Sequence, residues 1–223
     1  MSADTELQLY TYYRSSAAYR VRIALALKQL SYKQIPINLL KAEHKQKAYI
    51  EINRQGLVPA LATSEGVVTQ SLAIIEYLDE VYPQPPLLPK AAIDRAQVRA
   101  MAQQIAMEIH PLNNPKVTQF LTNNLELNES EKLSWYRHWI ALGFTSLERL
   151  LNETGATDSE AKYCFGHSAS VADICLIPQV YNALRFGCPM QDYPTINAIA
   201  KHCTALPAFI AASPESQADY PID

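Results

Sequence analysis

Residues 7–25 read LQLYTYYRSSAAYRVRIAL, an apolar and aromatic run followed by an alanine-rich segment. The pattern predicts a strand over Leu7–Tyr12 and a helix over Ser16–Leu30. Ser15 and Ser16 then lie at the turn where the strand ends and the helix begins. Helix N-termini leave backbone N–H groups unpaired and carry the positive end of the helix dipole, so anions bind there. A thiolate can be held at this turn, although serine is also a common N-cap that needs no ligand.

The rest of the first half continues to alternate between strand and helix patterns. We expect a strand over Tyr32–Asn38, a helix over Ala42–Ile52, two short strands over Pro59–Thr63 and Val67–Thr69, and a helix over Ser71–Tyr82. The order βαβ followed by ββα is that of a thioredoxin-like domain, although other small α/β folds share it.

A proline-rich segment separates the two halves of the chain. Residues 83–89 contain four prolines in seven positions, which cannot continue a helix and prefer extended backbone. We therefore expect domains at 1–82 and 92–223, joined by a linker over 83–91. Apolar residues recur at helical spacing beyond the linker, so the second domain is predicted to be all-helical. Pro111, Pro115 and Pro178 predict kinks or breaks in it.

Composition narrows the class of partner. The net charge is -3, and 18% of residues are charged without a long run of one sign, which disfavours a nucleic-acid footprint or a polybasic membrane anchor. No apolar run approaches the roughly 18 residues of a spanning helix, and the polar start is unlike a signal peptide. The four cysteines are widely spaced, so we expect reduced, mostly buried thiols and no metal site. A small-molecule partner and a cytoplasmic location follow.

Two further motifs lie downstream of the serine pair: residues 55–61 read QGLVPAL, and residues 70–78 read QSLAIIEYL. Together with residues 14–25, they resemble the signatures of zeta-class glutathione transferases, the maleylacetoacetate isomerase family, in the common bacterial form. The resemblance covers nearly the whole chain. It implies the cytosolic glutathione transferase fold, an α/β thioredoxin-like domain followed by an all-α domain. It also implies a homodimer that uses glutathione as a cosubstrate regenerated in each turnover.

The serine pair has a specific role in this family. The resemblance implies that one hydroxyl donates a hydrogen bond to the glutathione sulfur; we favour Ser15 and keep Ser16 as the alternative. A thiol with a pKa of about 8.5 is only about 3% ionised at pH 7, and lowering the pKa by about two makes it roughly three-quarters thiolate. Many members carry a cysteine at the next position, where this chain has Ala17. Glutaredoxin-like or omega-type activity is disfavoured because the first half contains no cysteine.

The resemblance also assigns glutathione contacts in the first half. It implies a cis peptide bond at Pro59, with the backbone of Val58 pairing to the glutathione cysteinyl backbone like an added strand. Ser71 and its helix start take the γ-glutamyl carboxylate, while Gln70 binds the amino acid head. His44 lies near the position of a glycyl-carboxylate contact. Without the resemblance, the proline is a simple strand start and the Gln-Ser pair a helix cap.

In the second half, the resemblance points to three residues. His110 and Asn113 correspond to the segment that faces the thiol site and are expected to contact glutathione, although His110 is equally well explained as a half-buried residue at a proline kink. Arg185 corresponds to a position that reaches the substrate carboxylate. We expect Arg14 and Arg185 together to select a dicarboxylate, since arginine grips carboxylates bidentately. The alternative is that these arginines tie the domains together.

Two polar features are assigned to folding instead. Residues 170–173 read SVAD and form a capping-box pattern before an apolar helical run, so Asp173 is interpreted as a cap. Arg20 and Arg22 are expected on a solvated or salt-bridged face of the first helix.

The sequence therefore predicts an enzyme that isomerises maleylacetoacetate to fumarylacetoacetate in tyrosine and phenylalanine catabolism. One alternative keeps the fold and changes the reaction: a maleylpyruvate isomerase, or a broad glutathione transferase or α-haloacid dehalogenase. Another is a glutathione-transferase-like binding protein without turnover, which the intact serine pair argues against.

Overall fold

The computed structural model describes residues 7–154 and 162–221. Its contacts divide the chain into two compact units. The first contains residues 1–86 together with 206–223, and the second contains residues 87–205. The sequence prediction differs here, because it placed everything after residue 92 in one helical domain. The last segment belongs to the first unit because helix α9 (Pro207–Ala212) packs along helix α1 (Ser16–Leu27).

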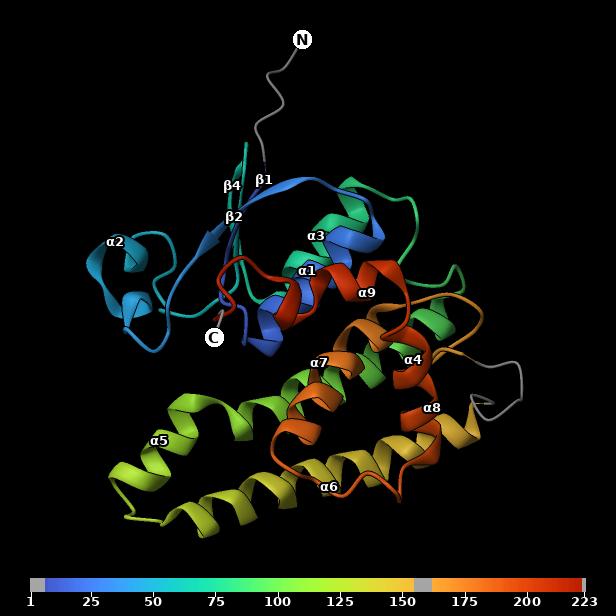
Figure 1. The fold of residues 1–223 in the computed structure, drawn as a ribbon. Coiled ribbons are helices and arrows are strands. Elements are labelled where there is room, and N and C mark those ends of the chain that lie inside the picture. The colour runs from blue at the N-terminus through green and yellow to red at the C-terminus, as the bar shows by residue number, and fades with distance from the viewer. Residues whose placement is uncertain (1–6, 155–161, 222–223) are drawn as a thin grey trace. The chain divides into compact units, whose positions relative to one another are not determined.

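The first unit is built on a four-stranded sheet. Its strands are β1 (Leu7–Thr11), β2 (Tyr32–Pro36), β3 (Ala60–Thr63) and β4 (Gly66–Thr69), in the order β2-β1-β3-β4. Strand β1 runs parallel to β2 and antiparallel to β3, which is antiparallel to β4. Helices α1, α3 (Ser71–Val81) and α9 gather on one side of the sheet, and the short α2 (Lys47–Ile50) lies on the other (Figure 1). A 3₁₀ turn, η4 (Pro214–Ser216), follows α9.

Helix α1 is enclosed far more completely than its sequence suggests. It packs against both α3 and α9, and nine of its twelve residues are buried. Arg20 and Arg22 are only 2% and 1% exposed, so the expectation of a solvated face was wrong. Arg22 donates to neutral oxygens of Thr11, Tyr13 and Ala212. The helix has no free face because a segment nearly 190 residues later in the chain covers the side that would otherwise meet solvent.

The predicted helix over Ala42–Ile52 is mostly irregular. The structure has a 3₁₀ turn, η1 (Glu43–Lys45), and then α2. Gln46 between them has extended backbone, with φ −74° and ψ 148°, which interrupts the helical hydrogen bonds. The Glu43 carboxylate also turns back to accept from the Asn38 N–H at 2.6 Å, stabilising a loop instead of a helix.

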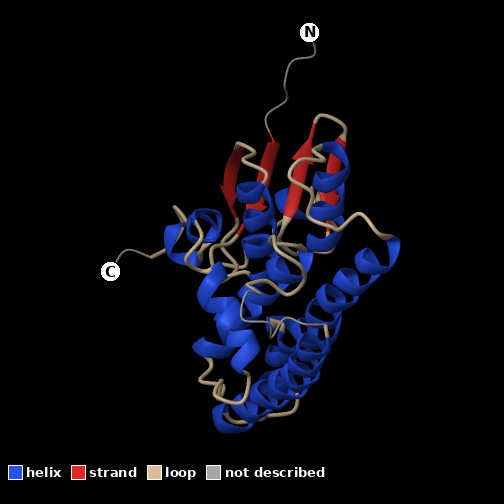
Figure 2. Cartoon of the chain, turned by 90° about the vertical axis from the view of Figure 1, so that its right-hand side faces the viewer, coloured by secondary structure: helices blue, strands red, loops and turns tan. Residues whose placement is uncertain are grey.

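The described residues of the second unit form helices joined by loops, without a strand (Figure 2). Its elements are α4 (Ala92–Gln103), a π-helical segment η2 (Gln104–Ile109), a 3₁₀ turn η3 (His110–Asn113), α5 (Pro115–Asn123), α6 (Glu129–Glu153), α7 (Val171–Arg185) and α8 (Pro194–Cys203). The expected breaks occur at Pro111 and Pro115, where one helical segment gives way to the next. At Pro178, by contrast, α7 continues without a break.

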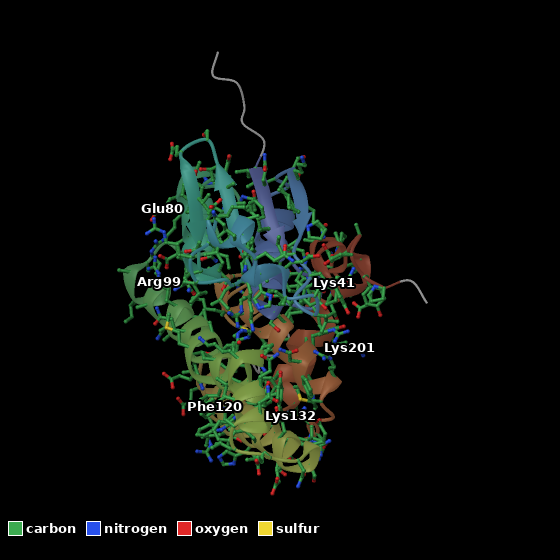
Figure 3. All side chains as sticks on the ribbon, turned by 90° about the vertical axis from the view of Figure 1, so that its left-hand side faces the viewer. Lys41, Glu80, Arg99, Phe120, Lys132 and Lys201 are labelled. Atoms are coloured by element: carbon green, nitrogen blue, oxygen red, sulfur yellow. The ribbon has the colours of Figure 1, made fainter. Side chains whose placement is uncertain are left out.

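The remaining bulk features agree with the composition. All four cysteines are buried and unbridged, as predicted. Charged side chains of both signs project from separate elements, as the labelled Lys41, Glu80 and Lys201 illustrate (Figure 3). Among residues 7–154 and 162–221, every helix is too short or too polar to span a bilayer.

Candidate functional site

Ser15 caps helix α1 with its side-chain oxygen, and its hydroxyl hydrogen remains available as a donor. Its backbone is extended, and its Oγ accepts a hydrogen bond from the Ala18 N–H at 3.2 Å. Because the oxygen acts as acceptor in this cap, the hydroxyl hydrogen can point away from the helix toward a ligand. Ser15 is half-buried, whereas Ser16 is only 6% exposed. The geometry therefore favours Ser15 over Ser16 as a donor to a thiolate, and that role stays a prediction.

A buried cation holds the turn that precedes Ser15. The Arg22 guanidinium donates to Thr11 Oγ1 at 3.1 Å, to the Tyr13 carbonyl at 3.0 Å and to the Ala212 carbonyl at 2.9 Å. Burial lowers the pKa of Arg22 to about 10, which still leaves it charged at neutral pH. The sequence interpretation missed this residue. The sequence does contain a signal for this burial. Almost every other residue of the helix is apolar, so the helix has no polar face on which its arginines could be solvated.

Arg14 is anchored beside the same turn. Its Nη2 donates to the Tyr13 hydroxyl, and its guanidinium carbon lies 5.2 Å from the centre of that ring. Arg14 is half-buried. Such a pre-ordered arginine can receive an anionic group at low entropic cost.

The Val58–Pro59 peptide bond is cis, as the sequence predicts. The preceding carbonyl, that of Leu57, accepts from the Tyr49 hydroxyl at 2.6 Å and from Asn53 Nδ2 at 2.7 Å. Val58 is buried, and within the described residues its backbone N–H and C=O make no hydrogen bond outside the sheet. This backbone is available to pair with an extended peptide-like ligand, in the manner of an added strand.

Helix α3 begins without a side-chain cap. Its N-cap residue Gln70 has φ 71° and donates Nε2 to Gln55 Oε1 at 2.7 Å. Ser71 at the first helical position is buried, and Arg20 Nη1 donates to its Oγ at 3.4 Å. The open N–H groups of the helix start and the buried guanidinium behind it make this position electropositive. It fits the predicted binding of a carboxylate, and Arg20 is a second contributor that the sequence interpretation missed.

His44 lies in η1 and is half-buried. Burial lowers its pKa, which keeps the imidazole neutral. Its Nδ1 is enclosed without a hydrogen-bond partner among the described residues. Its carbonyl oxygen lies 3.0 Å from where a Cβ on Gly56 would stand, so the loop closes here only because residue 56 is glycine with φ 60°. The predicted contact with glutathione stays a prediction.

In the second unit, Asn113 is the most informative of the predicted residues. It is 6% exposed, and both polar atoms of its carboxamide are enclosed without a partner in the part of the chain that the structure describes. A buried amide without partners is costly, which fits a residue completed by a ligand or a water molecule. The adjacent Leu112 carbonyl accepts from Trp135 Nε1 at 2.8 Å, which holds the segment in place. His110 begins η3 and is half-buried.

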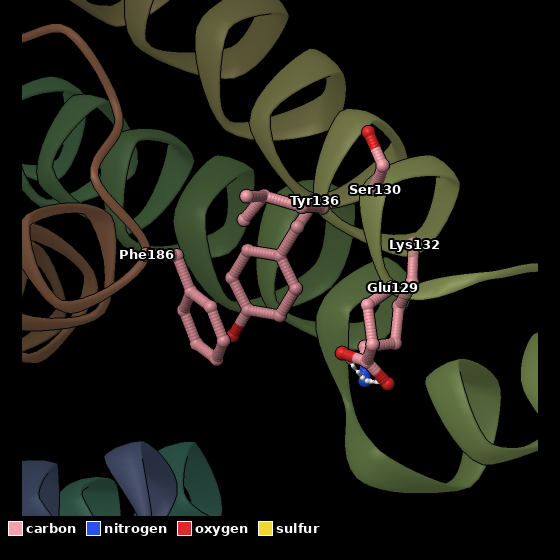
Figure 4. Close-up of a pocket in the computed structure, with 6 residues that line it drawn as sticks. Glu129, Ser130, Lys132, Tyr136 and Phe186 are labelled. Carbon is pink, nitrogen blue, oxygen red and sulfur yellow. Dashed lines mark hydrogen bonds and ion pairs between the residues drawn. The ribbon is translucent and has the colours of Figure 1, made fainter.

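Arg185 ends helix α7 and is exposed, with its guanidinium 4.7 Å from the Phe186 ring centre. Phe186 stacks on Tyr136 at 3.8 Å, and both rings border an open cavity of about 330 Å³ (Figure 4). The cavity is lined by Glu129, Ser130, Lys132, Leu133, Tyr136 and Phe186. None of the residues expected to bind glutathione lines it. Arg14 belongs to the first unit and Arg185 to the second, so their joint action on one substrate stays a prediction.

Asp173 behaves as predicted for a folding residue. The carboxylate is fully buried and completes the capping box with Ser170 at the start of α7. Within the described ranges, no group of three or more histidine, cysteine, aspartate or glutamate side chains is arranged to hold a metal ion.

Comparison with known proteins agrees with this arrangement. Residues 5–80 match the family described as Glutathione S-transferase, N-terminal domain. The chain is 48% identical over 215 residues to a protein of Vibrio cholerae named a probable maleylacetoacetate isomerase, covering 96% of this chain and 98% of that protein.

Two solved structures extend the likeness to the whole fold. The holo structure of a bacterial zeta-class maleylpyruvate isomerase superposes with a TM-score of 0.92 at 40% identity, covering 96% of this chain and all of that one. The maleylacetoacetate isomerase of Anaeromyxobacter dehalogenans, solved with glutathione in its active site, gives a TM-score of 0.87 at 37% identity, covering 97% and 98%. Both the predicted fold class and the family are therefore confirmed: this chain belongs to the zeta-class glutathione transferase and maleylacetoacetate isomerase family.

Proposed function

We propose that this chain is a cytoplasmic, homodimeric, glutathione-dependent isomerase that converts maleylacetoacetate to fumarylacetoacetate. The observation that carries the proposal is the start of α1, where the Ser15 oxygen caps the helix and leaves its hydrogen for a ligand sulfur. The similarity to maleylacetoacetate isomerases over nearly the full length of the chain supports the same reaction.

Glutathione fits the first unit in three places. The α3 start, with Ser71 above the buried Arg20, suits the γ-glutamyl carboxylate, while the Val58 backbone suits the cysteinyl backbone. Ser15 then lies where a hydroxyl donor at a helix N-terminus can stabilise a thiolate. Lowering the thiol pKa by two corresponds to about 2.7 kcal/mol, which one hydrogen bond and a helix terminus can supply together.

When bound, glutathione supplies a nucleophilic thiolate whose reversible addition to the cis double bond permits rotation. The chain's own residues keep that sulfur ionised, orient the cosubstrate and neutralise the substrate. Arg14, held against Tyr13, is assigned to one substrate carboxylate and Arg185 to the other. Positioning and charge stabilisation carry the catalysis, and no protein nucleophile is needed.

A second candidate is maleylpyruvate isomerase. The likeness to the solved maleylpyruvate isomerase is as strong as that to the solved maleylacetoacetate isomerase, and both substrates are cis-unsaturated dicarboxylates. The same clamp of two arginines serves either one.

The test is isomerisation followed with purified protein and both dicarboxylates, in the presence and absence of glutathione. We expect turnover only with glutathione and a higher kcat/KM for maleylacetoacetate. A higher kcat/KM for maleylpyruvate would instead identify the protein as a maleylpyruvate isomerase. Glutathione binding without turnover of either dicarboxylate, or of a haloacid, contradicts the proposal and favours a binding protein.

A further inference from the structure

We propose that Asp219, near the end of the chain, is a positioning residue for the thiolate site in the first unit. Its carboxylate holds the turn between β1 and α1 in the geometry that lets Ser15 reach the glutathione sulfur. The inference rests on the proposed function, since it assigns the residue that orients the same sulfur donor.

The contacts of Asp219 are specific and lie far apart in the sequence. Its Oδ2 accepts the backbone N–H of Tyr13 at 2.9 Å, and its Oδ1 accepts from Gln34 Nε2 at 3.1 Å. A charged acceptor on a backbone N–H makes a stronger hydrogen bond than a neutral one. Both carboxylate oxygens are used, so the side chain is fixed between the turn and strand β2.

The neighbours of Asp219 reinforce the same turn. The Tyr220 ring packs edge-on against Tyr13 at 5.4 Å, and the hydroxyl of Tyr13 accepts from Arg14. From the other side, Arg22 donates to the Tyr13 carbonyl and to the Ala212 carbonyl at the end of α9. Both backbone polar groups of Tyr13 are therefore held by charged side chains, one from the end of the chain and one from α1.

Tyr13 is a sensitive point because it lies two residues before Ser15. The turn closes with a hydrogen bond from the Ser15 N–H to the Tyr12 carbonyl at 2.9 Å, so a shift at Tyr13 is passed directly to Ser15. Catalytic groups lose efficiency when displaced by a fraction of an ångström. The residue that fixes the Tyr13 N–H therefore sets the position of the sulfur donor.

The direction in which the thiol pKa of bound glutathione changes distinguishes a positioning role of Asp219 from a simple charge effect. An aspartate acting only through its negative charge disfavours a nearby thiolate, so its removal would lower the thiol pKa. An aspartate that positions Ser15 favours the thiolate, so its removal raises the thiol pKa. A purely structural aspartate affects folding and leaves the pKa of bound glutathione unchanged.

The experiment is a pH titration of the ultraviolet thiolate absorption of glutathione bound to wild type and to Asp219→Ala. We expect the thiol pKa to rise in the variant and kcat/KM to fall about three- to thirtyfold, with most of the loss in kcat. Asp219→Asn retains one acceptor oxygen and should recover part of the difference. An unchanged or lower thiol pKa in a folded variant overturns the proposal.

Two further variants serve as matched controls. Tyr220→Phe keeps the ring against Tyr13 and should match wild type in thiol pKa. Gln34→Leu removes the second contact of Asp219 and leaves the Tyr13 contact, so its effect should be smaller than that of Asp219→Ala. An effect of Gln34→Leu equal to or larger than that of Asp219→Ala contradicts the assignment.

A measurement without glutathione keeps the proposal independent of the proposed function. Hydrogen exchange of the Tyr13–Ser16 amides in the free protein should speed up in Asp219→Ala, while the amides of β3 stay protected. Unchanged exchange at Tyr13 overturns the positioning role, whether or not the wild type isomerises either dicarboxylate. If the wild type turns over neither dicarboxylate, but its Tyr13 amide exchanges slowly and Asp219→Ala speeds that exchange, only the proposed function is contradicted.

Discussion

Helices α3 and α7 each begin at a polar residue ahead of buried apolar turns, yet their first turns are completed in opposite ways. At α7, the Asp173 carboxylate accepts the Ser170 N–H and hydroxyl, both at 2.8 Å, and the Cys164 N–H at 2.7 Å. At α3, no side chain caps the helix, and Gln70 adopts φ 71°.

The difference separates a helix start built for folding from one suited to a ligand. The α7 start is satisfied by its own carboxylate and leaves nothing for an external anion. The α3 start keeps its N–H groups open and places a non-glycine residue in a sparsely populated backbone region, which costs on the order of 1–3 kcal/mol. A strained, uncapped start of this kind fits the carboxylate contact proposed for Ser71.

The largest expected effect is at the α7 start. Asp173→Ala should lower the free energy of unfolding by about 3 kcal/mol or more, because three buried donors lose their acceptor. Urea denaturation measures the change. The folded fraction should bind glutathione as tightly as wild type does, and weaker binding by fully folded protein would contradict the division between the two helix starts.

A matched control for charge loss is Asp192→Asn, which changes an exposed aspartate of the same unit. It should alter the free energy of unfolding by less than about 0.5 kcal/mol.

The next effect is at the start of α1, which combines both roles because Ser15 caps the helix and is assigned to the sulfur. Ser15→Ala should lower kcat/KM by roughly ten- to a thousandfold, or about 1.4 to 4 kcal/mol, and raise the thiol pKa of bound glutathione. It should also cost about 1 kcal/mol of folding stability through the lost cap. Ser16→Ala is the comparison variant, and a larger kinetic loss there, with the fold intact, would transfer the sulfur contact to Ser16.

At the α3 start, Ser71→Ala should weaken glutathione binding by about 1 to 3 kcal/mol, because a bound carboxylate loses a hydrogen bond. Titration calorimetry with glutathione gives the affinity directly. Unchanged affinity would remove Ser71 from the site and weaken the contrast with α7.

The smallest effect tests the strain itself. Gln70→Gly should stabilise the fold by about 0.5–1 kcal/mol, since glycine adopts a positive φ without cost, while glutathione binds less tightly. Gln70→Ala loses the same carboxamide but keeps the unfavourable backbone, so the stability of the glycine variant relative to the alanine variant equals the strain less the entropic cost of glycine, about 0.5–1 kcal/mol. A glycine variant less stable than the alanine variant by that full amount would show that residue 70 is unstrained.

Local patterns predicted most of the first unit. The strand and helix order follows from local patterns, as does the Asp173 cap in the second unit, and both are found in the structure. The cis Val58–Pro59 bond, which the family resemblance implied, is also found. The burial of Arg20 and Arg22 was not predicted, because it depends on packing against α3 and α9, which are distant in sequence. The short α2 was also missed, because the extended Gln46 follows from loop closure and not from helix propensity.

The residues of the candidate site also divide into those that the sequence predicted and those that it did not. Ser15, Gln70 and Ser71 were expected at helix starts from the local pattern, and their contacts with glutathione were implied by the family resemblance. Arg22 and Asp219 could not be predicted, because their importance lies in which backbone groups they hold, and no sequence pattern encodes a contact between residues 13 and 219.

The return of residues 206–221 to the first unit has a consequence for synthesis. The second unit is continuous, so its whole chain is synthesised before α9. At roughly 5–20 residues per second, the intervening segment of about 120 residues delays α9 by on the order of ten seconds. During that interval α1 lacks its outer cover, and Arg22 lacks the acceptor that Ala212 later supplies. The nascent first unit therefore stays incomplete until α9 has been synthesised.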